Sequence, residues 1–130
     1  MSGKNEHGKI LLMDDEKDIM APLSEMLCEI GYEVDLAAEG AEAIDKYLKA
    51  QADGNPYDVV ILDLTIPGGI GGEQTIKRLI EIDPKVKAIV SSGYSDNPVL
   101  ANPRSFNFQE TVIKPYRVEE LRRILLKILN

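Results

Sequence analysis

The run Val59-Val60-Ile61-Leu62 is followed directly by Asp63, and this stretch decides the fold class. Four consecutive apolar residues show no alternation, which is typical of a strand that is buried on both faces. Strands of that kind belong to parallel sheets that helices cover on each side. We therefore predict an α/β fold in which a central strand ends at an acidic residue.

Short strand-like runs alternate with segments of helical periodicity along the rest of the chain. The five strand-like runs are residues 10–13, 34–37, 59–62, 86–90 and 111–113. The first helical segment carries one apolar stripe, formed by Ile19, Leu23, Met26, Leu27 and Ile30. Five alternations predict a doubly wound (βα)5 three-layer sandwich. Pro22 leaves open whether the first helix contains a proline or begins later, and residues 97–108 should hold a short helix at most.

The composition indicates one domain with an acidic surface. The chain has 130 residues, of which 44% are hydrophobic and 28% are charged, with a net charge of −7. We expect a disordered leader over residues 1–8 and the domain over residues 9–130. The acidic balance argues against nucleic-acid binding, and a single cysteine excludes an internal disulfide. Without an apolar run of about 20 residues we expect no direct membrane contact and a cytoplasmic location.

Polar residues follow the predicted strands at the edge where an open parallel sheet binds its ligands. Asp14 and Asp15 follow the first strand, Asp63 the third, Ser92 the fourth and Lys114 the fifth. If the first and third strands are neighbours, three carboxylates converge and require protonation or a cation, for which Mg²⁺ suits hard oxygen ligands. A metal, a lysine, a hydroxyl and a carboxylate nucleophile suit phosphoryl transfer. Taken singly, each acid could instead be a helix cap or a solvated turn residue.

Together these residues resemble the receiver domains of response regulators in two-component signalling. The resemblance covers residues 9–129, and its motifs are residues 10–16, 59–67, 92–93 and 114–116. It implies a flavodoxin-like fold with strand order 2-1-3-4-5. It also implies a phosphoacceptor domain of a phosphorelay, which takes a phosphoryl group from a kinase phosphohistidine and then switches conformation. The glycine-rich residues 67–72 and the tripeptide 92–94 are similar to the receivers of hybrid sensor histidine kinases, which would tether the domain to a membrane-bound protein.

The resemblance implies a role for each residue of the site. Asp63 would be the phosphoacceptor. Asp14, Asp15 and Asp63, with the backbone carbonyl of Thr65, would hold Mg²⁺, or Mn²⁺ in its place. Lys114 would pair with the phosphoryl group and precede a cis peptide bond to proline.

Four positions concern the switch and its tuning. Ser92, rather than Ser91, would donate a hydrogen bond to a phosphoryl oxygen. Thr111 stands where many family members carry a Tyr or Phe that swings inward on activation, so we expect a switch without a buried aromatic there. Tyr94 and Thr65 occupy positions that tune dephosphorylation.

The partner implied by the resemblance is a sensor histidine kinase or a histidine phosphotransfer domain. Family members also dimerise through the fourth helix, fifth strand and fifth helix. Two alternatives are a phosphorylation-independent pseudo-receiver and, less favoured, a small phosphatase with an aspartate nucleophile. The phosphatase family carries its Asp-x-Asp motif after the first strand and usually a cap domain. We expect no nucleotide cofactor, since Glu73 and Gln74 break the phosphate-loop patterns, and we interpret the glycine-rich loop as a flexible connector.

Overall fold

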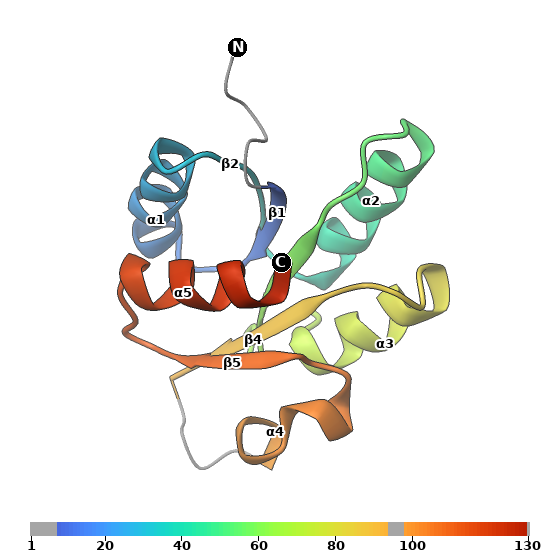
Figure 1. Ribbon diagram of the computed structural model, residues 1–130. Helices are drawn as coiled ribbons and strands as arrows, with labels where there is room; N and C mark the ends of the chain where they lie inside the picture. Colours follow the sequence, from blue (N-terminus) through green and yellow to red (C-terminus); the bar gives the residue numbers. More distant parts are fainter. Residues whose placement is uncertain (1–7, 94–97, 130) are drawn as a thin grey trace.

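The computed structural model describes residues 8–93 and 98–129, which form a parallel sheet between two layers of helices (Figure 1). The strand order is β2-β1-β3-β4-β5, as the resemblance implied. The strands are β1 (Gly8–Met13), β2 (Tyr32–Ala37), β3 (Val59–Asp63), β4 (Ala88–Ser92) and β5 (Glu110–Ile113). The helices are α1 (Lys17–Glu29), α2 (Gly40–Ala52), α3 (Gly72–Ile82), α4 (Pro98–Ala101) and α5 (Val118–Leu129), with a 3₁₀ turn at Pro103–Phe106.

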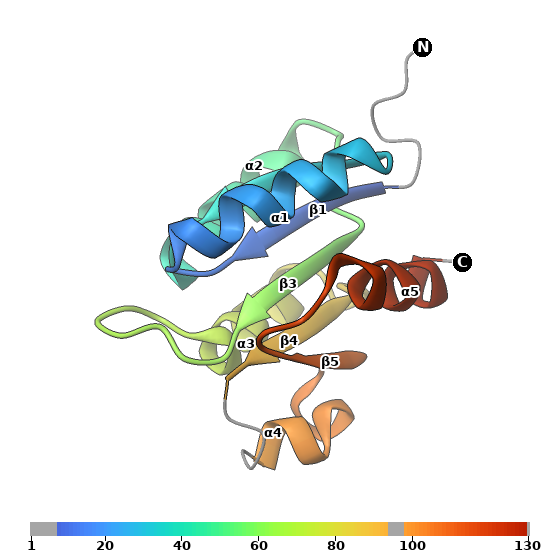
Figure 2. The same ribbon diagram turned by 90° about the vertical axis from the view of Figure 1, so that its left-hand side faces the viewer.

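Helices α1 and α5 cover one face of the sheet, and α2, α3 and α4 cover the other (Figure 1; Figure 2 shows the same layers from the side). Alternate residues of each central strand supply the two cores. In β3, Val60 and Leu62 pack beneath α2 and α3, whereas Val59 and Ile61 pack beneath α1 and α5. The apolar run that predicts the fold is thus buried on both faces, and its end carries Asp63 to the edge of the sheet.

Element boundaries differ slightly from the prediction. Strand β1 begins at Gly8, which therefore belongs to the sheet and not to the predicted leader; residues 1–7 lie outside the described residues. Strand β4 runs to Ser92, two residues beyond the predicted run, because Ser91 and Ser92 continue the ladder with β5. As predicted for residues 97–108, the described part from residue 98 onward holds little helix, namely the four residues of α4 and the 3₁₀ turn.

Helix α1 contains Pro22, which settles the question left open by the sequence. Its buried residues are Met20, Leu23 and Leu27, so the stripe facing the sheet is narrower than predicted. Ile19 and Met26, which the periodicity assigns to the core, are 44% and 40% exposed. None of the helices within the described ranges is long and apolar enough for a bilayer crossing.

The glycine-rich segment before α3 is closely packed where it meets β3. A Cβ atom on Gly71 would lie 2.4 Å from the carbonyl oxygen of Leu64, and one on Gly72 would lie 2.9 Å from that of Asp63. The amide of Gly72 donates a hydrogen bond to Leu64. Our interpretation of these two glycines as a flexible connector was wrong, because they let the start of α3 approach the backbone beside Asp63.

Candidate functional site

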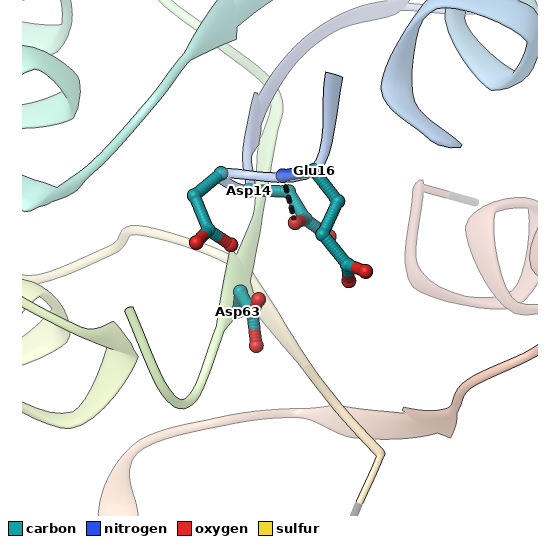
Figure 3. A group of neighbouring side chains, drawn as sticks. Asp14, Glu16 and Asp63 are labelled. Carbon is teal, nitrogen blue, oxygen red and sulfur yellow. Dashed lines mark hydrogen bonds between the residues drawn. The ribbon is translucent and has the colours of Figure 1, made fainter. Parts of the chain in front are cut away.

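A cleft of about 470 Å³ lies at the carboxyl ends of β1, β3, β4 and β5. It is lined by Asp15, Glu16, Asp63, Thr65, Pro67, Ser92, Gly93 and Lys114. Asp63 ends β3, and Asp14 follows β1 directly; both are almost completely buried. Figure 3 shows the carboxylates of Asp14, Glu16 and Asp63 gathered at this edge, where neighbouring β1 and β3 bring them together.

The side chain of Lys114 joins these carboxylates. Its Nζ lies 2.8 Å from Asp14 Oδ2, 2.9 Å from Asp63 Oδ2 and 3.0 Å from Glu16 Oε1. The backbone fixes the lysine beside β4, because the Lys114 amide donates to the carbonyl of Ser92. The Lys114–Pro115 peptide bond is cis, as the resemblance implied.

Two opposing effects act on the ionisable groups of this cluster. Burial raises the pKa of Asp63 above its usual value, although the hydrogen bond and charge of Lys114 oppose that rise. Burial alone would lower the pKa of Lys114, but its hydrogen bonds to Asp14, Asp63 and Glu16 prevail and raise it. The lysine is therefore a permanent cation, and its positive charge stabilises the negative charge of the buried carboxylates at the end of the sheet.

The donor set fits a hard divalent cation. One carboxylate oxygen from each of Asp14, Asp15, Glu16 and Asp63 lies within 4.8 Å of the others. Asp15 and Glu16 are exposed, so the group opens to solvent. Four carboxylates exceed the single ammonium group of Lys114 in charge, and oxygen ligands in a solvent-accessible cleft suit Mg²⁺ or Mn²⁺.

The remaining predicted positions take different places around the cleft. Ser92 is among the residues that line the cleft, and Ser91 is not. Thr65 also lines it, and its amide lies 3.3 Å from Asp63 Oδ1. Thr111 lies on β5 with a buried Oγ1 that has no hydrogen-bond partner among the described residues. Tyr94 lies outside the described residues.

Glu16 is the residue that the sequence argument missed. It stands third in the acidic run Asp14-Asp15-Glu16, which was the available signal, but the sequence gives no indication that it contacts Lys114 across 98 residues. Glu16, Gly93 and Lys114 also border a second, more apolar groove of about 730 Å³ between α1 and the start of α5. The exposed Ile19 and Met26 line that groove.

Comparison with known proteins gives a consistent assignment. Residues 10–126 match the model of the response regulator receiver domain. The sporulation initiation phosphotransferase F of Bacillus subtilis is 30% identical over 121 residues, which cover 93% of both chains. The response regulator TrrA of Thermotoga maritima, solved in complex with Mg²⁺-BeF, is 34% identical with a TM-score of 0.78 and coverage of 93% and 98%. The CheX-CheY-BeF₃-Mg²⁺ complex of Borrelia burgdorferi shares the fold, with a TM-score of 0.85 at 22% identity over 98% and 96% of the chains.

Proposed function

Because this chain belongs to the response regulator receiver family and is a phosphoacceptor domain, we propose that Asp63 is the residue that accepts the phosphoryl group. It is a signalling module rather than a classical enzyme. The observation that carries the assignment to Asp63 is its place at the end of β3, buried in the cleft and bonded to Lys114. The receiver family, together with an acceptor that ends β3 instead of following the first strand, replaces the small phosphatase as the explanation of the site.

The transfer requires one bond to form and one to break. A carboxylate oxygen of Asp63 attacks the phosphorus of a phosphohistidine, and the phosphorus–nitrogen bond breaks with its electron pair returning to the imidazole. The product is an acyl phosphate on Asp63. Lys114 lies 2.9 Å from Asp63 Oδ2, so its ammonium group is within reach of charge that develops on the transferred group. Ser92, whose hydroxyl would donate to a phosphoryl oxygen, lines the same cleft.

We assign the metal ligands to the acidic cluster. Asp14, Asp15, Asp63 and the carbonyl of Thr65 would hold Mg²⁺, or Mn²⁺ in its place; the bound ion would supply positive charge against the phosphoryl oxygens. The Mg²⁺-BeF complex of TrrA, which is 34% identical, supports this choice. Thr65 and Tyr94 would tune dephosphorylation, and Thr111 would replace the switch aromatic.

The phosphodonor would be a sensor histidine kinase or a histidine phosphotransfer domain. Its histidine must reach Asp63 through the cleft, and the apolar groove beside the cleft supports a protein as the donor. A homodimer through α4, β5 and α5 is a second proposed contact, supported by the exposed Ile113 and Leu126. Origin from a hybrid histidine kinase and a cytoplasmic location both stay predictions, as does a domain that begins after residue 8.

Titration with beryllofluoride, a stable mimic of the phosphoryl group, tests the assignment. With Mg²⁺ present, two-dimensional NMR should show saturable shifts at Asp15, Asp63, Ser92 and Lys114. The Asp63→Asn variant should keep its fold and show none of these shifts. A phosphotransfer assay should label only the wild type, and hydroxylamine should release the label because an acyl phosphate is labile to it. If the wild type shows no shifts with beryllofluoride at saturating Mg²⁺, the protein is a pseudo-receiver that docks without phosphorylation.

A further inference from the structure

We propose that Glu16 is a positioning residue, which holds Lys114 in the unphosphorylated protein and releases it when a phosphoryl group arrives on Asp63. This inference rests on the function proposed above. It begins from the three carboxylate oxygens that lie between 2.8 and 3.0 Å from the Nζ atom of Lys114.

Every hydrogen-bond donor of the Lys114 ammonium group is already used in this arrangement. A lysine carries three N–H donors and no acceptor, and Asp14, Asp63 and Glu16 occupy one each. A phosphoryl group on Asp63 brings new oxygens to the place where Lys114 now ends. The lysine can donate to one of them only if it gives up one of its present acceptors.

Exposure decides which contact is given up. The side chains of Asp14 and Asp63 are 3% and 6% exposed, whereas that of Glu16 is 52% exposed. A carboxylate that leaves Lys114 must find other partners, because an unpaired charge is costly where water does not reach it. Glu16 can turn into solvent, and Asp14 cannot. Glu16 is therefore the acceptor that the phosphoryl oxygen replaces.

Among the described contacts, the side chain of Glu16 makes no other hydrogen bond or ion pair that would hold the fold together. Glu16 precedes α1 but makes no side-chain capping hydrogen bond. Its amide donates to Asp14 Oδ1, and its carbonyl accepts from the amides of Ile19 and Met20. All three are backbone interactions that a substitution preserves, so variants at this position should fold.

Two variants measure the contribution of this contact. In Glu16→Gln and Glu16→Ala the unliganded state loses the ion pair, while the liganded state loses nothing that it uses. Beryllofluoride should therefore bind more tightly at saturating Mg²⁺, by about two- to five-fold, the range that corresponds to a partly exposed ion pair. Asp18→Asn is the matched control, since Asp18 also lines the groove at this end of α1 but makes no contact with Lys114 among those described.

A second measurement uses neither metal nor phosphoryl mimic. Exchange of the Lys114 ammonium protons with water, followed by NMR in the metal-free protein, should become faster in Glu16→Ala because one donor then faces solvent. Asp18→Asn should exchange at the wild-type rate. Unchanged exchange in Glu16→Ala would overturn the proposal, whatever the affinity for beryllofluoride.

The two measurements separate this inference from the function on which it rests. If the wild type binds no beryllofluoride, the assignment of Asp63 is overturned, and so is the release of Lys114 by Glu16 on phosphorylation. The contact between Glu16 and Lys114 in the unphosphorylated protein would still be detected by the exchange of the ammonium protons. A wild type that binds, with Glu16 variants that bind equally or more weakly, overturns the role of Glu16 alone. A loss of Mg²⁺ affinity in Glu16→Gln of more than about tenfold, with no such loss in Asp18→Asn, would overturn the proposal by showing that Glu16 supports the metal, as a ligand or as a partner of one.

Discussion

Replacing Lys114 by methionine removes the one cation that contacts the buried carboxylates within the described part of the chain. Asp14 and Asp63 then stay buried without a countercharge, and breaking a buried ion pair in this way costs about 3–5 kcal/mol. The cleft of about 470 Å³ admits water, so we expect the lower end, about 3 kcal/mol at pH 7.5. The contact with Glu16 is half exposed and contributes under about 1 kcal/mol.

The pH dependence of this loss provides the sharper test. Lys114 opposes the rise in the pKa of Asp63 that burial causes, so Lys114→Met should raise that pKa further. A carboxyl whose pKa is higher in the folded than in the unfolded protein binds protons preferentially when folded, and its destabilising effect appears as the pH rises. The loss of stability should therefore shrink as the pH falls from 7.5 toward the unfolded value of about 3.9.

Urea unfolding of both proteins between pH 4.5 and 7.5, in EDTA, measures the difference. Lys127→Met is the matched control, because Lys127 pairs with Glu110 at 2.7 Å but is 72% exposed. That variant should lose at most about 1 kcal/mol at any pH in the range. Equal losses in the two variants, or a loss in Lys114→Met that does not change with pH, would refute the account of a buried charge cluster.

Three further variants test other parts of the site. Asp63→Asn should be more stable than the wild type at pH 7.5 and lose that advantage toward pH 4, because the folded-state pKa of Asp63 is raised. Urea unfolding measures the difference in stability between the two proteins. A difference that grows as the pH falls would contradict the raised pKa. Asp15→Ala should weaken Mg²⁺ binding about tenfold or more by calorimetry, while its melting temperature in EDTA rises slightly, because removal of an exposed like charge relieves repulsion. Gly71→Ala should cost about 1–3 kcal/mol, since its Cβ would meet Leu64 at 2.4 Å, whereas Gly93→Ala, with nothing within 4 Å, should cost little.

The sequence predicts the sheet and the position of the site for a physical reason. Parallel strands place their carboxyl ends at one edge, so residues that follow separate strands are brought together once the strand order is known. Asp14, Asp63, Ser92 and Lys114 therefore meet as expected. The buried run of β3 is read directly from its composition, since a strand covered on both faces has no polar alternation.

The remaining features depend on packing that periodicity does not specify. A helical stripe does not reveal how much of it the sheet covers, so Ile19 and Met26 lie outside the core and line a groove. The number of glycines in this segment suggests flexibility. At Gly71, however, glycine is required because the backbone there lies too close to Leu64 for a Cβ atom. The contact of Glu16 with Lys114 depends on the directions of two side chains in the loops that follow β1 and β5, which are far apart in the sequence.

The strand order has a consequence for how the protein is made. Lys114 meets Asp63 across 51 residues and Glu16 across 98, and contacts of such long range form late because chain closure must come first. During synthesis the acids of β1 and β3 leave the ribosome well before the lysine that neutralises them. An incomplete chain thus carries the repulsion of the acidic cluster without its cation. We therefore expect that the site is complete only once β5 has joined the sheet, because Lys114 follows that strand.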